Sequence, residues 1–274
     1  MLNSEETRLV YQHAYLPEHL IEYVESISGA EPHLQENYLS FFQKKHLIFI
    51  GYPLGNTKKD VPQAYHWACE HFLPSTAAII APEIWLSDHN LRKRSTDTYY
   101  RIQLPLLSLD PAVDYMVRRA KRELSVTEAK YEKAHGKLIK EFIATHDLAQ
   151  EQQHMFKQVP QYLKTSTTAR LFEARKKKVL VAFSIMDLGA ADYAFYLFNF
   201  RSMMETVPGA SDLLFSHMIQ LAQSEGKRAI NLGLGIHPGI RRFKEKWGGV
   251  PFCSYASALV VRKSTDLDRL MNKL

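Results

Sequence analysis

Length, composition and charge exclude several classes of protein. The chain has 274 residues, 46% of them hydrophobic and 23% charged, which fits a globular protein of about two domains and excludes disordered, collagen-like and disulfide-rich chains. Thirty-five Lys and Arg against 29 Asp and Glu give a net charge of +6, which favours an anionic partner. Cys69 and Cys253 have neither zinc-type nor disulfide-type spacing, and no basic-then-apolar leader or membrane-spanning apolar run is visible. We therefore expect a cytoplasmic protein without a transmembrane segment.

The N-terminal part combines strand and helix patterns. The apolar run at 47–51 predicts a buried strand that ends in turn residues, and two further strands are expected at 77–81 and 99–104. Between the first two, the pattern of residues 61–72 predicts a helix with Asp60 as its N-cap and a proline in its first turn. The fold class expected from this part is α/β.

From residue 109 onward the patterns become clearer. Asp110 caps a helix that has Pro111 at its first position and runs to about Glu123. Two more helices are expected at about 127–145 and 150–163, followed by three strands in consecutive hairpins at 169–174, 179–188 and 193–200. The last expected elements are a helix that begins after the turn at 207–212 and stops at Gly226, a strand at 227–232, a helix from Pro238 to about Lys246 and a strand at 252–261.

Several catalytic motifs are absent from the sequence. It contains no Walker A loop, no G-x-S-x-G elbow, no H-x-x-x-x-D pair and no H-E-x-x-H zinc motif. His66, Cys69, Glu70 and His71 share one expected helix, but no second cluster of ligands accompanies them. We therefore interpret them as ordinary helix residues and expect no metal site.

The strand expected at 227–232 is followed by glycines. Gly233, Gly235 and Gly239 are spaced one residue too widely for a dinucleotide-binding G-x-G-x-x-G loop. They would instead let a ligand approach the strand backbone closely. Asn231 lies on the same strand, and two interpretations stay open for its amide: hydrogen bonding to a ligand, or a structural role.

The turn at 207–212 opens a helix whose first backbone N–H groups can bind an anion. Asp212 in the first turn opposes that interpretation, because its negative charge would repel a bound phosphate. Ser211 has an alternative role as an ordinary N-cap.

The helix expected from Pro238 carries a basic face. Phe243 and Trp247 form an apolar stripe, Arg242 and Lys246 lie on another face, and Lys244 lies between them. Beside a glycine-lined strand end, such cations can hold phosphates or neutralise an oxyanion. Each basic run alone is typical of a solvated surface, but together they favour an anionic partner; the four runs are 92–94, 118–122, 175–178 and 241–246.

Four segments resemble the final half of GNAT-fold acyltransferases. They are Phe200-Arg-Ser202, Pro208-Gly-Ala-Ser-Asp-Leu-Leu214, Glu225-Gly-Lys-Arg-Ala-Ile-Asn-Leu-Gly233 and Arg242-Phe-Lys-Glu-Lys-Trp-Gly248. They are most similar to the C-terminal domain of phosphatidylglycerol lysyltransferase and to Fem-type peptidoglycan aminoacyltransferases. The basic helix at 116–124 also resembles the one that joins the two GNAT-like units of those families.

The resemblance implies a tandem GNAT-like architecture with mixed sheets flanked by helices, an incomplete unit at 1–109 and a fuller unit at 110–274. It implies acyl transfer from an activated carrier to an amine or hydroxyl acceptor, which would be a small molecule, a peptide or a lipid headgroup. We expect Asn231, Lys244 and Lys246 to be catalytic. The expected donor-binding residues are Arg201, Ser202, Pro208, Gly209, Ala210, Ser211, Gly233, Gly235, Arg241 and Arg242.

The donor is expected to be a cosubstrate, with no permanently bound cofactor. The window of Thr206, Gly209 and Ser211 matches only the first glycine of the acetyl-CoA loop of ordinary GNAT enzymes. This departure and the basic runs favour aminoacyl-tRNA over acyl-CoA or an acyl carrier protein. No carboxylate is an obvious base, although Asp192, Glu205 and Asp212 are candidates. A non-catalytic module that binds nucleic acid or protein is therefore the alternative outside enzymes.

Overall fold

The computed structural model describes residues 2–55, 60–87 and 91–261 and divides the chain into two compact units. Unit 1 takes its residues from 1–10, 29–98 and 253–274, and unit 2 takes its residues from 11–28 and 99–252. Each unit therefore combines segments that are distant in the sequence. The boundary predicted between residues 109 and 110 stays a prediction about two GNAT-like copies.

Unit 1 is a mixed sheet with one covering helix. Its strand order is β1-β2-β3-β4-β11, in which β3 and β4 are parallel and the other neighbours antiparallel. The helix α3 (Val61–Phe72) begins as predicted, with the Asp60 carboxylate accepting the N–H of Gln63 at 3.3 Å. The bounds of the remaining elements are α1 (Ser4–His13, shared with unit 2), β1 (Glu31–Gln35), β2 (Tyr38–Gln43), β3 (His46–Ile50), β4 (Thr76–Ala81) and β11 (Val250–Val261, of which 250–252 belong to unit 2).

The sheet strands of unit 2 follow the order β5-β10-β9-β8-β7-β6. Their only parallel pair among the described residues is β9 with β10. The bounds are η1 (Pro17–His19), α2 (Ile21–Ser28), β5 (Leu91–Gln103, of which 91–98 belong to unit 1), α4 (Pro111–Lys121), β6 (Ser125–Ala129), α5 (Lys133–Thr145), α6 (Gln150–Lys157), α7 (Val159–Thr165), β7 (Ala169–Lys176), β8 (Val179–Asp187), β9 (Tyr193–Arg201), α8 (Ala210–Ser224), β10 (Ala229–Leu234) and α9 (Pro238–Lys246).

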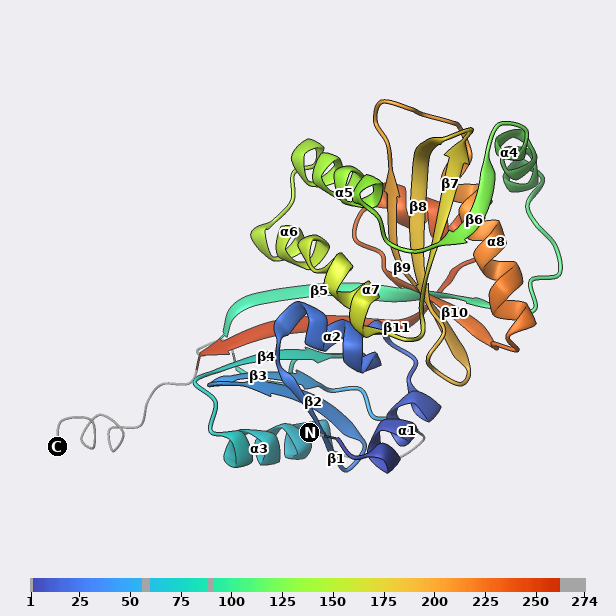
Figure 1. Cartoon of the computed structure of the whole chain (residues 1–274). Helices are drawn as coiled ribbons and strands as arrows, with labels where there is room; N and C mark the ends of the chain where they lie inside the picture. Colours follow the sequence, from blue (N-terminus) through green and yellow to red (C-terminus); the bar gives the residue numbers. More distant parts are fainter. Residues whose placement is uncertain (1, 56–59, 88–90, 262–274) are drawn as a thin grey trace. The chain divides into compact units, whose positions relative to one another are not determined.

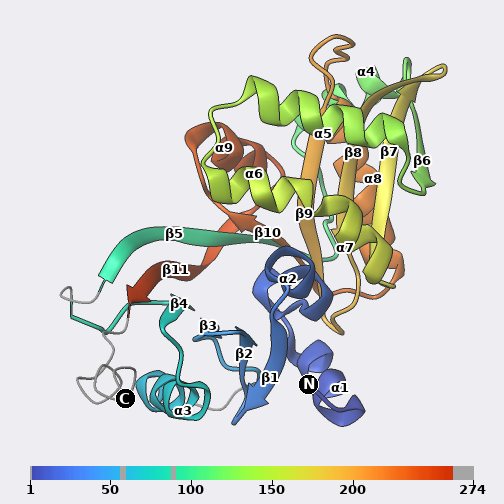
Figure 2. The same ribbon diagram turned by 60° about the vertical axis from the view of Figure 1, so that its left-hand side comes forward.

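Helices cover both faces of the unit 2 sheet (Figures 1 and 2). On one face, Leu214 and Phe215 of α8 pack in a cluster with Ile230 of β10 and with residues of α4. On the other face, α5, α6 and α7 pack with Phe183 and Phe198 of the strands. Figure 2 shows α5, α6 and α7 in front of the strands and α8 behind them. The parallel pair β9–β10 therefore lies in the interior of the unit.

The structure confirms most elements expected from residue 109 onward and corrects two helices. Residues 125–129, expected in part as helix, form β6 because they pair with β7, so α5 begins only at Lys133. The helix expected at 150–163 is two helices that meet at Gln158, with Pro160 in the first turn of α7. No described helix has the length and apolarity needed to cross a bilayer. A cytoplasmic location stays a prediction.

Candidate functional site

The parallel ladder of unit 2 ends before either of its two strands does. The ladder between β9 and β10 runs from the pair Tyr193–Ala229 to the pair Phe195–Asn231 and continues no further among the described residues. Just beyond this point β9 contains a bulge, because Met186 pairs with Tyr196 while Ile185 pairs with Phe198, which leaves Leu197 as the extra residue. We call this region the strand opening. Backbone groups that leave a ladder inside a sheet are available to bind a ligand.

Asn231 organises the β10 side of the strand opening. Its side chain is fully buried; Nδ2 donates to the carbonyl oxygen of Tyr15 at 2.7 Å, and Oδ1 accepts the N–H of Gly233 at 2.7 Å. Gly233 has a φ of +72°, in the left-handed region that glycine adopts without strain. Both halves of the amide are thus used within the protein. The geometry gives Asn231 a structural role, in which it holds the irregularity of β10 and fixes the segment that leads into η1.

Lys244 lies at the strand opening rather than in solvent. The sequence predicted a surface cation, but the side chain is only 4% exposed and its Nζ donates to the carbonyl oxygen of Leu234, at the end of β10. The ammonium also lies 5.7 Å from the centroid of the Tyr100 ring. A Cβ atom added to Gly233 would lie 4.0 Å from Nζ. Asn231, Gly233 and Lys244 are therefore brought together by the fold.

Lys246 and Trp247 connect α9 to the first turn of α8. Lys246 Nζ lies 2.5 Å from Oδ1 of Asp212, and Trp247 Nε1 donates to the same oxygen at 2.9 Å. Asp212 is 5% exposed and Trp247 is 2% exposed. Lys246, which we expected to be a free cation, is therefore paired with Asp212. The same ion pair compensates the negative charge of Asp212, which had opposed anion binding at this helix terminus. Asp212 is likewise committed to these partners rather than free to act as a base.

The N-terminus of α8 has the backbone geometry of an anion site. Gly209 has a φ of +83°, and a Cβ atom there would lie 2.4 Å from the carbonyl oxygen of Met116 in α4, so glycine is required. Ser211 accepts a hydrogen bond from Nδ2 of Asn199 at 3.0 Å. Ser202 is buried, and its hydroxyl accepts the N–H groups of residues 204 and 205, both at 3.1 Å. Ser202 therefore shapes the loop before α8, in which Arg201 and Pro208 are exposed and Ala210 is buried.

Two of the predicted basic runs meet beside this helix terminus. Ser125, just after α4, pairs with Arg175, so the end of α4 lies next to the β7–β8 hairpin. Arg118 and Lys176 have acidic partners, at 2.8 Å and 3.0 Å. Five exposed cations have no acidic partner among the described residues, and we call them the basic surface: Arg119, Lys121, Arg122, Lys177 and Lys178. The contact of α4 with Gly209 places this surface near the α8 N-terminus.

The remaining predicted residues lie apart from these clusters. Arg241 and Arg242 are exposed in the first half of α9, and neither has an ion pair in the part of the chain that the structure describes. Gly235 is buried after the end of β10. In α3, Nε2 of His66 pairs with Glu70 at 3.0 Å on the exposed surface. No group of three His, Cys, Asp or Glu side chains within the described ranges could hold a metal.

Two residues of unit 2, Glu18 and Arg101, were not anticipated from the sequence. Glu18 of η1 lies beside the Tyr99 hydroxyl, and burial raises the pKa of its carboxyl group. Arg101 of β5 is the register partner of Asn231 and donates to the hydroxyl of Tyr193 at 2.9 Å. They come from segments far apart in the chain and match no motif. Only the fold brings them together.

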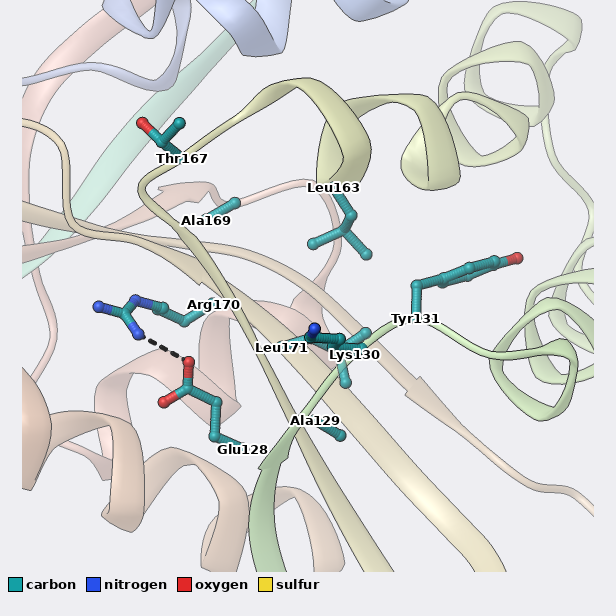
Figure 3. A pocket seen from close by; sticks show the side chains of 9 residues that line it. All are labelled: Glu128, Ala129, Lys130, Tyr131, Leu163, Thr167, Ala169, Arg170 and Leu171. Atoms are coloured by element: carbon teal, nitrogen blue, oxygen red, sulfur yellow. Dashed lines mark hydrogen bonds and ion pairs between the residues drawn. The ribbon is translucent and has the colours of Figure 1, made fainter.

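A cavity of about 460 Å³ lies elsewhere in unit 2, where the end of β6 meets α7 (Figure 3). Lys130, Tyr131 and Leu163 line it, and an ion pair of 2.8 Å between Arg170 and Glu128 lies at its side. None of its lining residues was predicted to be functional. The cavity does not include the strand opening or the α8 N-terminus.

Comparisons with known proteins identify the fold. No family model and no curated protein matches the chain. Solved structures similar to it include the C-terminal domain of a putative lysylphosphatidylglycerol synthetase from Agrobacterium fabrum (TM-score 0.64, 16% identity, 99% of this chain and 96% of that chain). FemX (TM-score 0.66, 12% identity, 99% and 98%) and a GCN5-related N-acetyltransferase from Kribbella flavida (0.55, 13%, 96% and 97%) are also similar. The chain has the GNAT fold, and the expected α/β class is confirmed.

Proposed function

We propose that this chain is an acyltransferase that moves an aminoacyl group from aminoacyl-tRNA to an amine or hydroxyl acceptor. The observation that carries the choice of donor is the basic surface beside the N-terminus of α8. Its five exposed cations lack acidic partners among the described residues, so phosphates can bind them without breaking existing ion pairs. Proteins contact helical RNA mainly through its backbone, which such a surface fits.

The strand opening supplies the groups that acyl transfer requires. The acceptor amine attacks the acyl carbon, a C–N bond forms, the ester C–O bond breaks, and the released ribose oxygen takes up a proton. In this proposal, backbone N–H groups near Leu197 stabilise the negative charge that develops on the carbonyl oxygen. Lys244, held at the end of β10, adds a fixed positive charge. Asn231 positions β10 and does not contact the reacting atoms.

The proposed donor is tested by the salt dependence of tRNA binding. Five phosphate contacts predict that the logarithm of the association constant falls with the logarithm of salt concentration with a slope of about −4. The double variant Lys177→Gln/Lys178→Gln should bind more weakly and reduce that slope by about 1–2. Its matched control is Lys137→Gln/Lys140→Gln, because both lysines are exposed on α5, on the other face of the sheet. The control should keep the slope of the unmodified protein.

Two outcomes would replace this proposal. Tight binding of acyl-CoA without tRNA binding at low salt would identify a CoA-dependent acyltransferase, with the α8 N-terminus as the pyrophosphate site. A lack of binding of both donors, together with no transfer to a panel of amines, would indicate a non-catalytic module.

A further inference from the structure

Glu18 is a half-buried acid with a buried Oε2 atom, on the face of the unit 2 sheet opposite α8. Tyr100 belongs to the cluster around α8, and since side chains alternate along a strand, Tyr99 points to the other face. The Tyr99 hydroxyl lies beside the Glu18 carboxyl group and lowers its pKa, whereas no hydrogen bond of normal geometry reaches the buried Oε2 atom among the described residues. A buried, unsatisfied carboxyl oxygen is costly in a folded protein. A ligand that donates a hydrogen bond would remove that cost.

Arg101 is a half-buried cation on the same face. It stands two residues after Tyr99 on β5, about 7 Å along the strand, and its guanidinium lies beside Tyr193, Phe252 and the side-chain amide of Gln103. Nη1 donates to Tyr193 at 2.9 Å, and the guanidinium lies 4.9 Å from the centroid of the Phe252 ring. No carboxylate pairs with Arg101 anywhere in the described ranges. Its charge is therefore available to an anionic group.

Aromatic rings connect the surroundings of Glu18 with those of Arg101. The Phe252 ring, which contacts Arg101, lies 6.4 Å from the Tyr99 ring. Tyr15 precedes Glu18 by three residues, and its carbonyl oxygen accepts a hydrogen bond from Asn231. The centroids of the Tyr15 and Tyr193 rings lie 6.4 Å apart. The acid and the cation thus lie on one face of the sheet, and Arg101 stands beside Asn231 at the point where the parallel ladder ends.

From this juxtaposition we infer the chemical class of the acceptor: a small molecule that carries a primary amine and an anionic group. The inference rests on the proposed function. Glu18 binds the ammonium group and Arg101 binds the carboxylate or phosphate of the same molecule. Neither an uncharged amine nor a simple anion satisfies both side chains.

Glu18 also has a proton-transfer role in this arrangement. The acceptor ammonium gives one proton to the Glu18 carboxylate, and the resulting amine forms the C–N bond with the acyl carbon. The second proton lost from nitrogen goes to the departing ribose oxygen as the ester C–O bond breaks. Glu18 then releases its proton to water. Burial raises the pKa of this carboxyl group, which brings it closer to the range of an effective base at neutral pH.

The test uses matched probes and isothermal titration calorimetry. The ω-amino acids from glycine to ε-aminocaproate are compared with alkylamines and alkanoates of the same length, and aminoalkylphosphonates distinguish phosphate from carboxylate recognition. At least one bifunctional probe should bind about tenfold or more tightly than both of its single-charge counterparts. Glu18→Gln and Arg101→Gln should each remove that advantage, whereas Arg101→Lys, which keeps the charge, should retain part of it.

The controls separate this inference from the proposed function. The control variants are Glu225→Gln and Arg228→Gln, which replace an exposed acid and an exposed cation. Each variant should bind the probes with the affinity of the unmodified protein. Glu18→Gln should bind tRNA normally, because Glu18 is not part of the basic surface. If no bifunctional probe has an advantage, or if the advantage survives Glu18→Gln and Arg101→Gln, the inference is wrong even where tRNA binding is intact. Loss of tRNA binding in the unmodified protein would instead overturn the proposed donor.

Discussion

Replacing Lys246 with methionine should destabilise the protein rather than only impair a reaction. The Lys246 ammonium lies 2.5 Å from the Asp212 carboxylate, whose side chain is 7% exposed. Methionine keeps most of the aliphatic length of lysine but leaves this carboxylate without its cation. The carboxylate would retain only the hydrogen bond from Trp247, at 2.9 Å.

The expected cost follows from the burial of the two partners. Removing one partner of a fully buried ion pair costs about 3–5 kcal/mol. The Lys246 side chain is 35% exposed, so water already screens part of the pair, and we expect a loss of about 2 kcal/mol in the free energy of unfolding. Asp212→Asn should cost less, about 1 kcal/mol, because the lysine left behind can reach solvent. The double variant should be no less stable than Lys246→Met alone.

Urea unfolding of the four proteins in this cycle, followed by tryptophan fluorescence, measures the coupling directly. We predict a coupling free energy of about 1 kcal/mol between Lys246 and Asp212. The midpoint should move while the dependence on urea concentration stays constant. Additive effects of the two single changes would refute the assignment of Lys246 to this ion pair and return it to the set of free cations expected from the sequence.

Three further predictions concern stability. Gly209→Ala should lower the thermal unfolding temperature more than Gly226→Ala does. Both positions have positive φ (+83° and +70°), but only the Cβ added at Gly209 would meet another atom, the Met116 carbonyl oxygen, at 2.4 Å. Equal losses would contradict that contact. Trp247→Ala should lose about 3–5 kcal/mol of unfolding free energy in urea, since the indole is 2% exposed, and a loss below about 1 kcal/mol would contradict its burial. Burial lowers the pKa of His135 below its ordinary 6.5, although Glu173 opposes the shift. The contribution of the neutral imidazole to stability is therefore complete above pH 6.5 and is lost as the pH falls through the lowered pKa. In His135→Gln, the unfolding free energy in urea should fall less steeply between pH 6.5 and that pKa. An unchanged pH dependence would contradict this prediction.

Local signals in the sequence predicted local structure well. Asp60 and Asp110 were recognised as N-caps, and both accept a backbone N–H in the structure, from Gln63 and Ala112. The β6 strand was missed because residues 125–129 have no strand-like alternation of apolar and polar residues. Their strand conformation comes from pairing with β7, which is more than 40 residues away in the sequence. Such non-local pairing is invisible to a pattern read along the chain.

Part of the candidate site was likewise predictable from the sequence and part was not. Asn231, Gly233 and the Gly209 turn were found from the motifs of the resemblance, and the structure places Asn231 and Gly233 beside Lys244. The burial of Lys244 could not be predicted, because lysine is usually solvated and its acceptor is a backbone carbonyl group at the end of another element. Glu18 and Arg101 are more than 80 residues apart in the sequence and carry no motif. Their relation depends on the packing of η1 against the sheet.

Transfer of an aminoacyl group from tRNA to an acceptor can be measured in a single assay. Aminoacyl-tRNAs with labelled amino acids are incubated with the protein and with small molecules that carry both an amine and an anionic group, and the label is followed into the acid-soluble product. We predict that the label moves from tRNA to such an acceptor at low salt, more slowly with Lys177→Gln/Lys178→Gln and at the unmodified rate with Lys137→Gln/Lys140→Gln. A label that stays on tRNA while acyl-CoA is consumed with the same acceptors would contradict aminoacyl-tRNA as the donor.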